Sequence, residues 1–345
     1  MAFVIISDTH HHAWSAFGKT LDNGVNSRNQ IILDETRRAG ELALEHDAVL
    51  IHAGDLFHVR GNIAPSVFNP VIKLYGELVE RGLKVVMIPG NHDMEARESG
   101  SMTNAVTAME SVGVTVCHAP SVIEKYGLTL VPWQPTVMQL KSILEGVDAN
   151  KNHSLILHAP IDGVIEGLPD HGLTAEWLAS LGFGRVFSGH YHAFKAMDGG
   201  VYSIGALTHQ TWGDVGTRAG FLFVDDEGKV LRCATHAPSF IDLDPTLPED
   251  DVALMVDGNY VRARVEVERE SQIADMREWL ISLGAAGVVI HPIKKAAVVS
   301  RTGTTVSAGV SLGASVAEFI RLKGLARQEK LNVLCAEILS ESEAV

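Results

Sequence analysis

Several short apolar runs in this sequence are followed at once by side chains that can bind metal ions. In chain order these polar residues are Asp8, His10, Asp55, Asn91, His92, Asp93, His158, His190 and His192. The carboxyl ends of strands in an open α/β sheet meet at one edge, so side chains placed there can gather in one site. Mixed oxygen and nitrogen donors without cysteine suit Mn²⁺, Fe²⁺ or Zn²⁺ in a hydrolytic role.

These donors are too many for one ion. Two ions about 3.5 to 4 Å apart, sharing a bridging carboxylate, are the arrangement that stabilises an in-line displacement at phosphorus. Taken singly, an Asp-x-His at a strand end is more often a hydrogen-bonded loop, and a lone His158 is more often a core histidine. We favour the metal site because independent strand ends would otherwise have supplied ligands to one place by accident.

The elements that must position these residues are short strands alternating with helices up to about residue 240, which indicates a sheet layered with helices. The expected strands are FVIIS, AVLIHAG, KVVMIPG, VTVCHA, LTLVPW, SLILHAP, RVFSGH, VYSIGA and GFLFVD. One expected helix keeps an apolar face through Val67, Val71, Leu74, Tyr75 and Leu78. The later strands have little helix between them, so an α/β (α+β) fold with mixed or packed sheets is expected.

The chain after residue 241 is expected to form smaller parts. Residues 242–251, DLDPTLPEDD, are rich in acid and proline and predict a linker. A small αβ unit over residues 252–302 follows, with strand YVRARVEV, helix SQIADMREWLISLGA and strand GVVIHPIK. Residues 303–345 are expected to hold a flexible tether and a helical tail from Val316 to Leu339, packed on its own domain or docked on a partner.

The composition limits the classes of function. A net charge of -14 argues against a protein that coats nucleic acid by bulk electrostatics, although a local basic groove or bound metal ions remain compatible with it. Three widely spaced cysteines predict no disulfide framework. Neither a basic, apolar leader nor a run of about 18 apolar residues is evident, so a cytoplasmic protein is expected.

The order D-x-H, G-D-x-x-H, G-N-H-D, a lone histidine and G-H-x-H resembles the calcineurin-like metallophosphoesterase superfamily over roughly residues 3–225. The resemblance implies a four-layer fold in which two mixed sheets are flanked by helices. It implies that one metal is bound by Asp8, His10 and His192, and the other by Asn91, His158 and His190. Asp55 would bridge the two ions.

The resemblance also implies roles for residues that do not bind metal. His92 would steady the transition state or protonate the leaving oxygen, and Asp93 would orient its imidazole. His52 stands where SbcD-type repair nucleases carry a histidine, which makes it a third catalytic candidate. His11 and His12 match no ligand position, so we interpret them as solvated loop residues, with contact to substrate phosphate as the alternative.

Other segments resemble the SbcD-type nucleases in particular. Val59 and Arg60 follow GDLFH as in their second motif, while Trp212 and Asp214 stand where phenylalanine and glutamate are more usual. The small unit and the tail match the layout of a capping domain that grips DNA and a segment that docks on an SbcC-type ABC ATPase. Candidate phosphate contacts, for which ordinary solvated charge is an equal explanation, are Arg262, Arg264, Lys294, Lys295 and Arg301.

The resemblance therefore implies a manganese-dependent DNA exonuclease and endonuclease. It would act at DNA ends or hairpins in repair, recombination or replication, as a homodimer that works with the ATPase. A small-molecule or cyclic-nucleotide phosphodiesterase or nucleotidase would share every metal ligand. A catalytically inactive scaffold would have lost ligands or His92, and this chain keeps them.

Overall fold

The computed structural model describes residues 1–95, 104–267, 269–294, 312–324 and 326–342. It contains two compact units, Met1–Ile293 and Lys294–Val345. The first unit holds three sheets and the helices α1 to α6, and the described part of the second holds helices α7 and α8.

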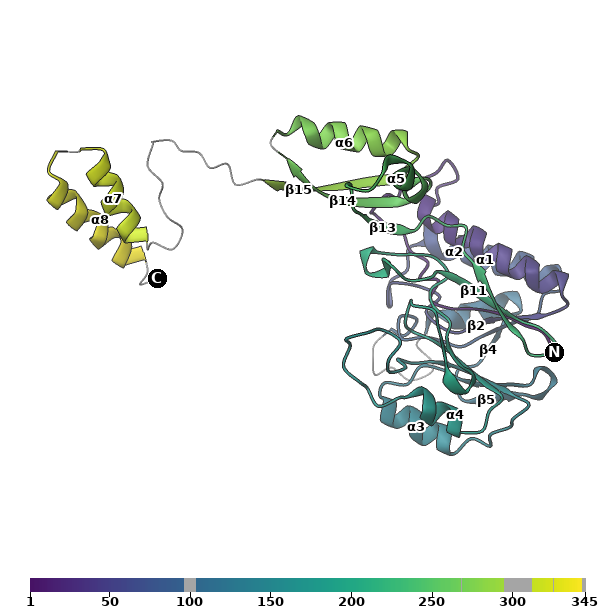
Figure 1. Ribbon diagram of the computed structural model, residues 1–345. Helices are drawn as coiled ribbons and strands as arrows, with labels where there is room; N and C mark the ends of the chain where they lie inside the picture. The colour runs from purple at the N-terminus through teal and green to yellow at the C-terminus, as the bar shows by residue number, and fades with distance from the viewer. Residues whose placement is uncertain (96–103, 268, 295–311, 325, 343–345) are drawn as a thin grey trace. The chain divides into compact units, whose positions relative to one another are not determined.

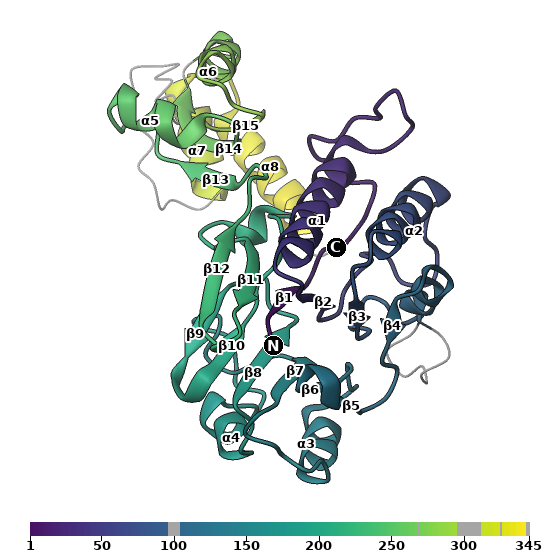
Figure 2. The same cartoon turned by 90° about the vertical axis from the view of Figure 1, so that its right-hand side faces the viewer.

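The first sheet (Figure 1) has the strand order β12-β11-β1-β2-β3-β4, and each of these strands is labelled in Figure 2. Its strands are β1 (Phe3–Ile6), β2 (Val49–His52), β3 (Val85–Met87), β4 (Thr115–Val116), β11 (Gly220–Val224) and β12 (Val230–Ala234). Strands β1 to β4 run parallel, while β11 is antiparallel to β1 and β12 to β11. Because β1 to β3 are parallel and buried on both faces, they read as continuous apolar runs.

The second sheet has the order β5-β6-β7-β8-β10-β9. Its strands are β5 (Ser121–Ile123), β6 (Leu128–Val131), β7 (Ser154–His158), β8 (Arg185–Gly189), β9 (Lys195–Met197) and β10 (Val201–Ser203). The central strands β6, β7, β8 and β10 are parallel, and the edge strands β5 and β9 are antiparallel to their neighbours. Both sheets are therefore mixed.

The two sheets lie between layers of helices (Figure 1). Alternating side chains of the strands pack these layers together. In β1, Val4 and Ile6 pack in one apolar cluster with α1 (Ser27–Glu45) and α2 (Pro65–Glu80). Phe3 and Ile5 point the other way and pack against the second sheet. The far face of that sheet packs on α3 (Val137–Glu145) and α4 (Ala175–Ser180). This is the four-layer fold of two mixed sheets flanked by helices that the resemblance to the calcineurin-like superfamily implied.

The helix predicted from the apolar spacing is α2, and all five of the residues named for it are buried. Four 3₁₀ helices, η1 (Ala105–Val112), η2 (Glu124–Tyr126), η3 (Asp198–Gly200) and η4 (Trp212–Asp214), lie in connections. Strands β5, β9 and β12 were not among the expected strands, because they lie at sheet edges, their side chains are half-buried or exposed, and their apolar patterns are weak.

A third sheet, β13-β14-β15, follows with two helices. Its elements are β13 (Phe240–Leu243), α5 (Glu249–Val256), β14 (Tyr260–Val267), α6 (Ser271–Ser282) and β15 (Gly287–Lys294). The prediction of a linker over residues 242–251 is wrong, because the end of β13 and the start of α5 lie there. The isolated apolar residues Leu243 and Val252 are both buried in the core of this part, and the acids and prolines around them hid that pattern.

The tail is a pair of helices, α7 (Leu312–Leu322) and α8 (Gln328–Ser342), where one helical segment was expected. The last four residues of the expected tether, 312–315, belong to α7, and its residues 303–311 lie outside the described residues. Of the helices in the described segments, none combines the length and the apolar character needed to cross a membrane.

Candidate metal centre

The strand ends of the two sheets deliver the predicted metal ligands to one place. Asp8 and His10 follow β1, Asp55 follows β2 and Asn91 follows β3, all in the first sheet. His158 is the last residue of β7, and His190 and His192 follow β8, in the second sheet. The site therefore lies where the carboxyl edges of both sheets meet, the position at which ligands bind in open α/β sheets.

One group of ligand atoms comes from Asp8, His10 and His192, and these atoms lie within 4.8 Å of one another. Nε2 of His10 is 3.3 Å from Nε2 of His192 and 3.9 Å from Oδ1 of Asp8. It also lies 3.5 Å from Oδ2 of Asp55.

A second group comes from Asp55, His158 and His190, again within 4.8 Å. Nε2 of His158 lies 3.4 Å from Oδ2 of Asp55 and 3.1 Å from Oδ1 of Asn91. Nδ1 of His190 is 2.9 Å from the same Asn91 oxygen. Oδ2 of Asp55 is near both groups, which is the position a bridging carboxylate needs.

Hydrogen bonds fix the protonation of two of the imidazoles. Nδ1 of His192 donates to Oδ1 of Asp214 at 2.6 Å, and Nδ1 of His158 donates to the carbonyl oxygen of Ala53 at 2.8 Å. Each ring then offers the lone pair of Nε2 to the cluster, which is how metal-binding histidines are held. The donor set therefore fits a pair of divalent metal ions.

The pKa shifts of the acidic and imidazole groups also indicate a site for cations. Burial and the neighbouring Asp55 raise the pKa of Asp8 to about 6, although His158 opposes the shift. Burial disfavours the charged forms of Asp55 and His158. The attraction between the two groups outweighs burial, so the pKa of Asp55 is lowered and that of His158 is raised. Burying the carboxylates of Asp8 and Asp55 close together costs free energy unless positive charge lies beside them. Divalent cations would supply that charge.

The backbone at the site is held in a conformation that non-glycine residues rarely adopt. The φ angles are 50° at Asp8, 46° at His10, 57° at Asp55 and 96° at His190. Such strain gathers at functional sites, where the surrounding structure enforces it. Gly90 shows how close the packing is, since a Cβ atom there would collide with the carboxylate and backbone nitrogen of Asp55.

His92 lies beside the ligands, but Asp93 does not orient it as expected. Nδ1 of His92 donates to the carbonyl oxygen of His58 at 2.7 Å, and its backbone nitrogen donates to Oδ1 of Asp55 at 2.7 Å. The buried carboxylate of Asp93 accepts from the backbone nitrogens of Phe57 and Gly90 at 3.0 and 2.8 Å. Asp93 therefore ties together the two loops that carry the ligands, and a carbonyl group positions the imidazole of His92.

The catalytic candidate His52 lies behind the metal ligands. It ends β2, is buried, and its Nε2 pairs with Oγ1 of Thr9 at 3.0 Å. Burial lowers its pKa to about 3, so the ring is neutral. This position suits support of the loop that carries Asp8 and His10 better than contact with substrate.

The interpretation of His11 as a solvated loop residue is wrong. Its side chain is buried and Nδ1 pairs with Oδ1 of Asn29 on α1 at 2.9 Å. His12 is half-buried, and its ring lies beside Trp14 and His58.

Sequence reasoning gave no role to three residues that the structure brings to the site. His58 stacks on His92 with ring centroids 5.4 Å apart and lies edge-on to His10 at 5.3 Å. Asp214 holds His192, as described above. The ring of Trp133 stacks on His190 at 5.4 Å. The signal for His58 was its place as the histidine of G-D-x-x-H, and Asp214 stood out as the acid that follows Trp212.

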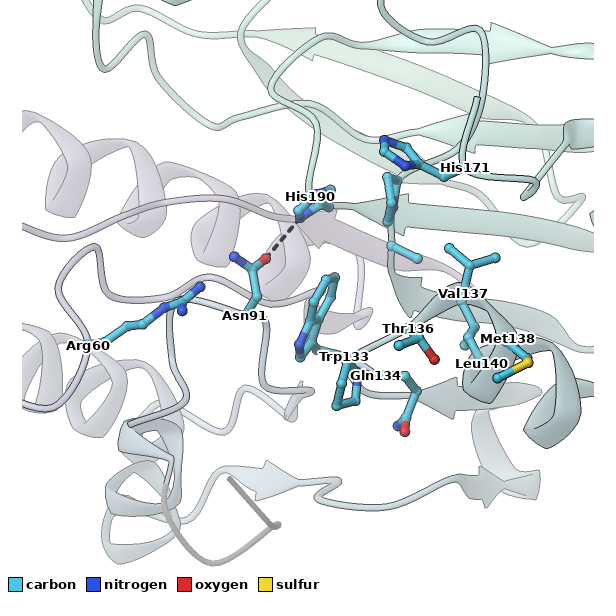
Figure 3. Close-up of a pocket in the computed structure, with 13 residues that line it drawn as sticks. Arg60, Asn91, Trp133, Gln134, Thr136, Val137, Met138, Leu140, His171 and His190 are labelled. Carbon is cyan, nitrogen blue, oxygen red and sulfur yellow. Dashed lines mark hydrogen bonds between the residues drawn. The ribbon is translucent and has the colours of Figure 1, made fainter. Parts of the chain in front are cut away.

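Two cavities open beside the cluster. One of about 580 Å³ borders Asn91 and His190 (Figure 3). The other, of about 740 Å³, borders His190, His192 and Asp214. His190 therefore lies between two spaces, each large enough for part of an organic ligand.

The predicted phosphate contacts of the third sheet are not part of the cluster. The guanidinium of Arg262 pairs with Asp242 at 2.5 and 2.6 Å and lies 4.5 Å from the ring centroid of Trp212. Arg264 is exposed on β14, and Lys294 ends β15. Lys295 and Arg301 lie outside the described residues.

Comparison with known proteins identifies the family. The family model described as calcineurin-like phosphoesterase matches residues 1–194, which is more than half of the chain. The chain belongs to the calcineurin-like phosphoesterase family. Together with the His and Asp cluster, this membership makes the protein a metal-dependent phosphoesterase.

Solved structures include two that are similar at low identity. A dimetal phosphatase from Danio rerio is 11% identical, with 65% of this chain and 91% of that chain covered and a TM-score of 0.38. The nuclease MPE from Pseudomonas putida is 20% identical, with 66% and 86% covered and a TM-score of 0.29. No curated protein matches the chain.

The chemistry of this phosphoesterase divides between the metal ions and the chain. Divalent ions held at the cluster would supply an activated water and neutralise charge on the phosphoryl oxygens. The predicted ligands described above would hold these ions. The carbonyl oxygen of His58 holds Nδ1 of His92, so Nε2 is the ring atom left for a substrate oxygen.

Proposed function

We propose that the protein is a two-metal-dependent DNA nuclease that hydrolyses phosphodiester bonds as an exonuclease and endonuclease. The observation that supports this most is the pair of cavities that meet at His190. A phosphate bound at the cluster has room on both sides, which suits a diester with two organic substituents. A phosphate monoester would need only one of these spaces.

The substrate class follows from what surrounds the cavities. Each is bordered by one arginine, Arg60 in the first and Arg218 in the second. Guanidinium groups on either side of the cluster would bind phosphates that flank the scissile one. This arrangement favours a polymer of phosphodiesters over an isolated small diester.

The third sheet is joined to the loop that supports the metal ligands, which supports a role in presenting DNA. The backbone nitrogen of Phe240 in β13 donates to Nδ1 of His209 at 3.0 Å, and its ring packs edge-on against Trp212 at 4.8 Å. Asp214, the partner of His192, lies in this same loop. DNA bound by the third sheet would therefore lie near the metal centre.

The individual roles that we propose follow the geometry of the two groups. Asp8, His10 and His192 bind one ion, Asn91, His158 and His190 bind the other, and Asp55 bridges them. His92 acts as the proton donor to the leaving oxygen. We propose Mn²⁺ as the metal, because mixed carboxylate, carboxamide and imidazole donors suit it.

The partners are part of the proposal. Helices α7 and α8 expose Phe319, Val333 and Leu334, apolar side chains that would dock on an SbcC-type ABC ATPase. A homodimer is expected from the resemblance to the SbcD-type nucleases. The work of such a complex is DNA repair, recombination or replication.

Digestion of end-labelled linear duplex DNA in Mn²⁺ tests the proposal, with Asp55→Ala as the inactive control and a cyclic nucleotide and a generic diester as competing substrates. Cleavage of DNA that depends on Asp55 would support the nuclease and give its polarity. Turnover of the small diesters alone would contradict it and favour the rival, a small-molecule or cyclic-nucleotide phosphodiesterase.

A further inference from the structure

The cavity beside Asn91 is lined by aromatic, apolar, basic and neutral polar side chains. It borders the metal centre through Asn91 and His190, and its other surfaces include Trp133, Met138, Arg60 and His171. Among the described residues that line it, none is an aspartate or glutamate, although the chain holds 42 acidic against 28 basic residues. The cavity is thus open to an anionic ligand, and Figure 3 shows Arg60 reaching toward Asn91 at its edge.

Trp133 is a fixed wall of this cavity. Its backbone nitrogen donates to the carbonyl oxygen of Pro89 at 3.1 Å, which ties it to the loop that carries Asn91. Its ring stacks on His190 at 5.4 Å with an interplanar angle of 25°, and it meets His158 edge-on at 6.2 Å. The indole is therefore held in place by the metal ligands themselves, before any substrate binds.

Met138 supplies a second apolar surface at the cavity. It lies in the first turn of α3, and 79% of its side chain is exposed. A flexible thioether packs well against aromatic rings. A fixed indole and an exposed methionine that line the same cavity, with Gln134, Thr136 and His171 as hydrogen-bonding groups, suit a flat heteroaromatic ligand that also carries polar edges.

We propose that this cavity binds the nucleobase of the nucleotide joined to the scissile phosphate, with Trp133 and Met138 as the residues that recognise it. The proposal rests on the nuclease function above and names the part of the strand that lies next to the bond. Stacking on an indole accepts any base, so the cavity selects nucleotides over other phosphate esters without reading a sequence. Arg60, which borders the same cavity, binds the phosphate on the far side of this nucleotide from the scissile bond.

Calorimetric titration of the Mn²⁺-loaded full chain with dAMP and with deoxyribose 5-phosphate measures the contribution of the base. We expect dAMP to bind about 5- to 150-fold more tightly, the range that stacking of one base on an aromatic side chain gives. Trp133→Ala should bring the ratio of the two affinities close to one and leave deoxyribose 5-phosphate binding unchanged. Trp133→Phe should keep most of the preference, and Met138→Ala should lower it partly.

Leu254→Ala is the control, because Leu254 is an exposed apolar side chain outside the lining of the cavity. Equal binding of the two ligands to the wild type would overturn the proposal. So would an equal loss of both affinities in Trp133→Ala, because Trp133 would then only support His190. If Trp133→Ala does not fold, a smaller preference for dAMP in Met138→Ala supports the proposal, and an unchanged preference in that variant overturns it.

The outcome for the cavity can be separated from the outcome for the nuclease. A preference for dAMP that depends on Trp133, in a protein that does not digest DNA, would refute the nuclease and leave a nucleotide site serving a small nucleotide diester. Digestion of DNA without any preference for dAMP would leave the nuclease in place and remove the base-binding role of the cavity.

Discussion

The hydrogen bond between Asp214 and His192 leads to a specific prediction about metal affinity. Oδ2 of Asp214 accepts from the backbone nitrogens of Gln210 and Thr211 at 2.7 and 2.8 Å, and Oδ1 accepts from Nδ1 of His192 at 2.6 Å. In Asp214→Asn the amide oxygen must stay with the two backbone donors. The amide NH₂ group then faces Nδ1 of His192.

The consequence is a change of tautomer in His192. To accept from the new NH₂ group, Nδ1 must lose its proton, which moves to Nε2, the atom that faces His10. If the proton moves, His192 no longer has an Nε2 lone pair for a metal ion. If it stays, the N–H of Nδ1 faces the new NH₂ group, and two donors oppose each other. Loss of such a supporting bond lowers metal affinity about 10- to 100-fold, which corresponds to about 1.4 to 2.7 kcal/mol.

Calorimetric titration of the metal-free protein with Mn²⁺ measures this loss. The control is Asp225→Asn, the same chemical change at a hairpin carboxylate that accepts from the backbone nitrogen of Lys229 at 2.8 Å. We expect wild-type affinity in the control and weaker binding of one ion in Asp214→Asn. Equal affinity in all three proteins would refute the argument that Asp214 sets the tautomer of His192.

Three further predictions concern the residues around Asp55. Asp55→Ala should abolish turnover and remove one or both ions, and full metal content by elemental analysis would contradict the bridging assignment. His92→Gln should keep both ions and slow turnover about 10²- to 10⁴-fold; an unchanged rate would exclude His92 from proton transfer. Gly90→Ala should lower the free energy of unfolding in a urea titration by about 1 to 3 kcal/mol and weaken metal binding, because its Cβ collides with Asp55. Gly76→Ala, inside α2, is the matched control, because a Cβ there meets only Val112 at ordinary contact distance. It should not lower the free energy of unfolding and should raise it by up to about 1 kcal/mol, since alanine is favoured over glycine in a helix interior.

The layers and the gathering of the ligands could be predicted from the sequence, because both depend on local patterns. Buried parallel strands leave continuous apolar runs, and a polar residue directly after such a run lies at the sheet edge. Asp8, Asp55 and His190 are visible in this way. The third sheet was misjudged at β13, since a four-residue strand beside acids and prolines carries too little pattern to identify.

Contacts between distant segments could not be predicted in the same way. The pairing of Asp214 with His192 depends on how the loop after β10 folds back, and no local pattern encodes it. The burial of His11 follows from the position of Asn29 on α1, another segment. The resemblance implied that Asp93 orients His92, but its carboxylate faces the loop of Phe57.

Anomalous scattering from a crystal of the Mn²⁺-loaded protein tests the two-metal centre most directly. We expect two peaks about 3.5 to 4 Å apart, one beside Asp8, His10 and His192 and one beside Asn91, His158 and His190, with Asp55 between them. A single peak, or peaks away from these residues, would contradict the account.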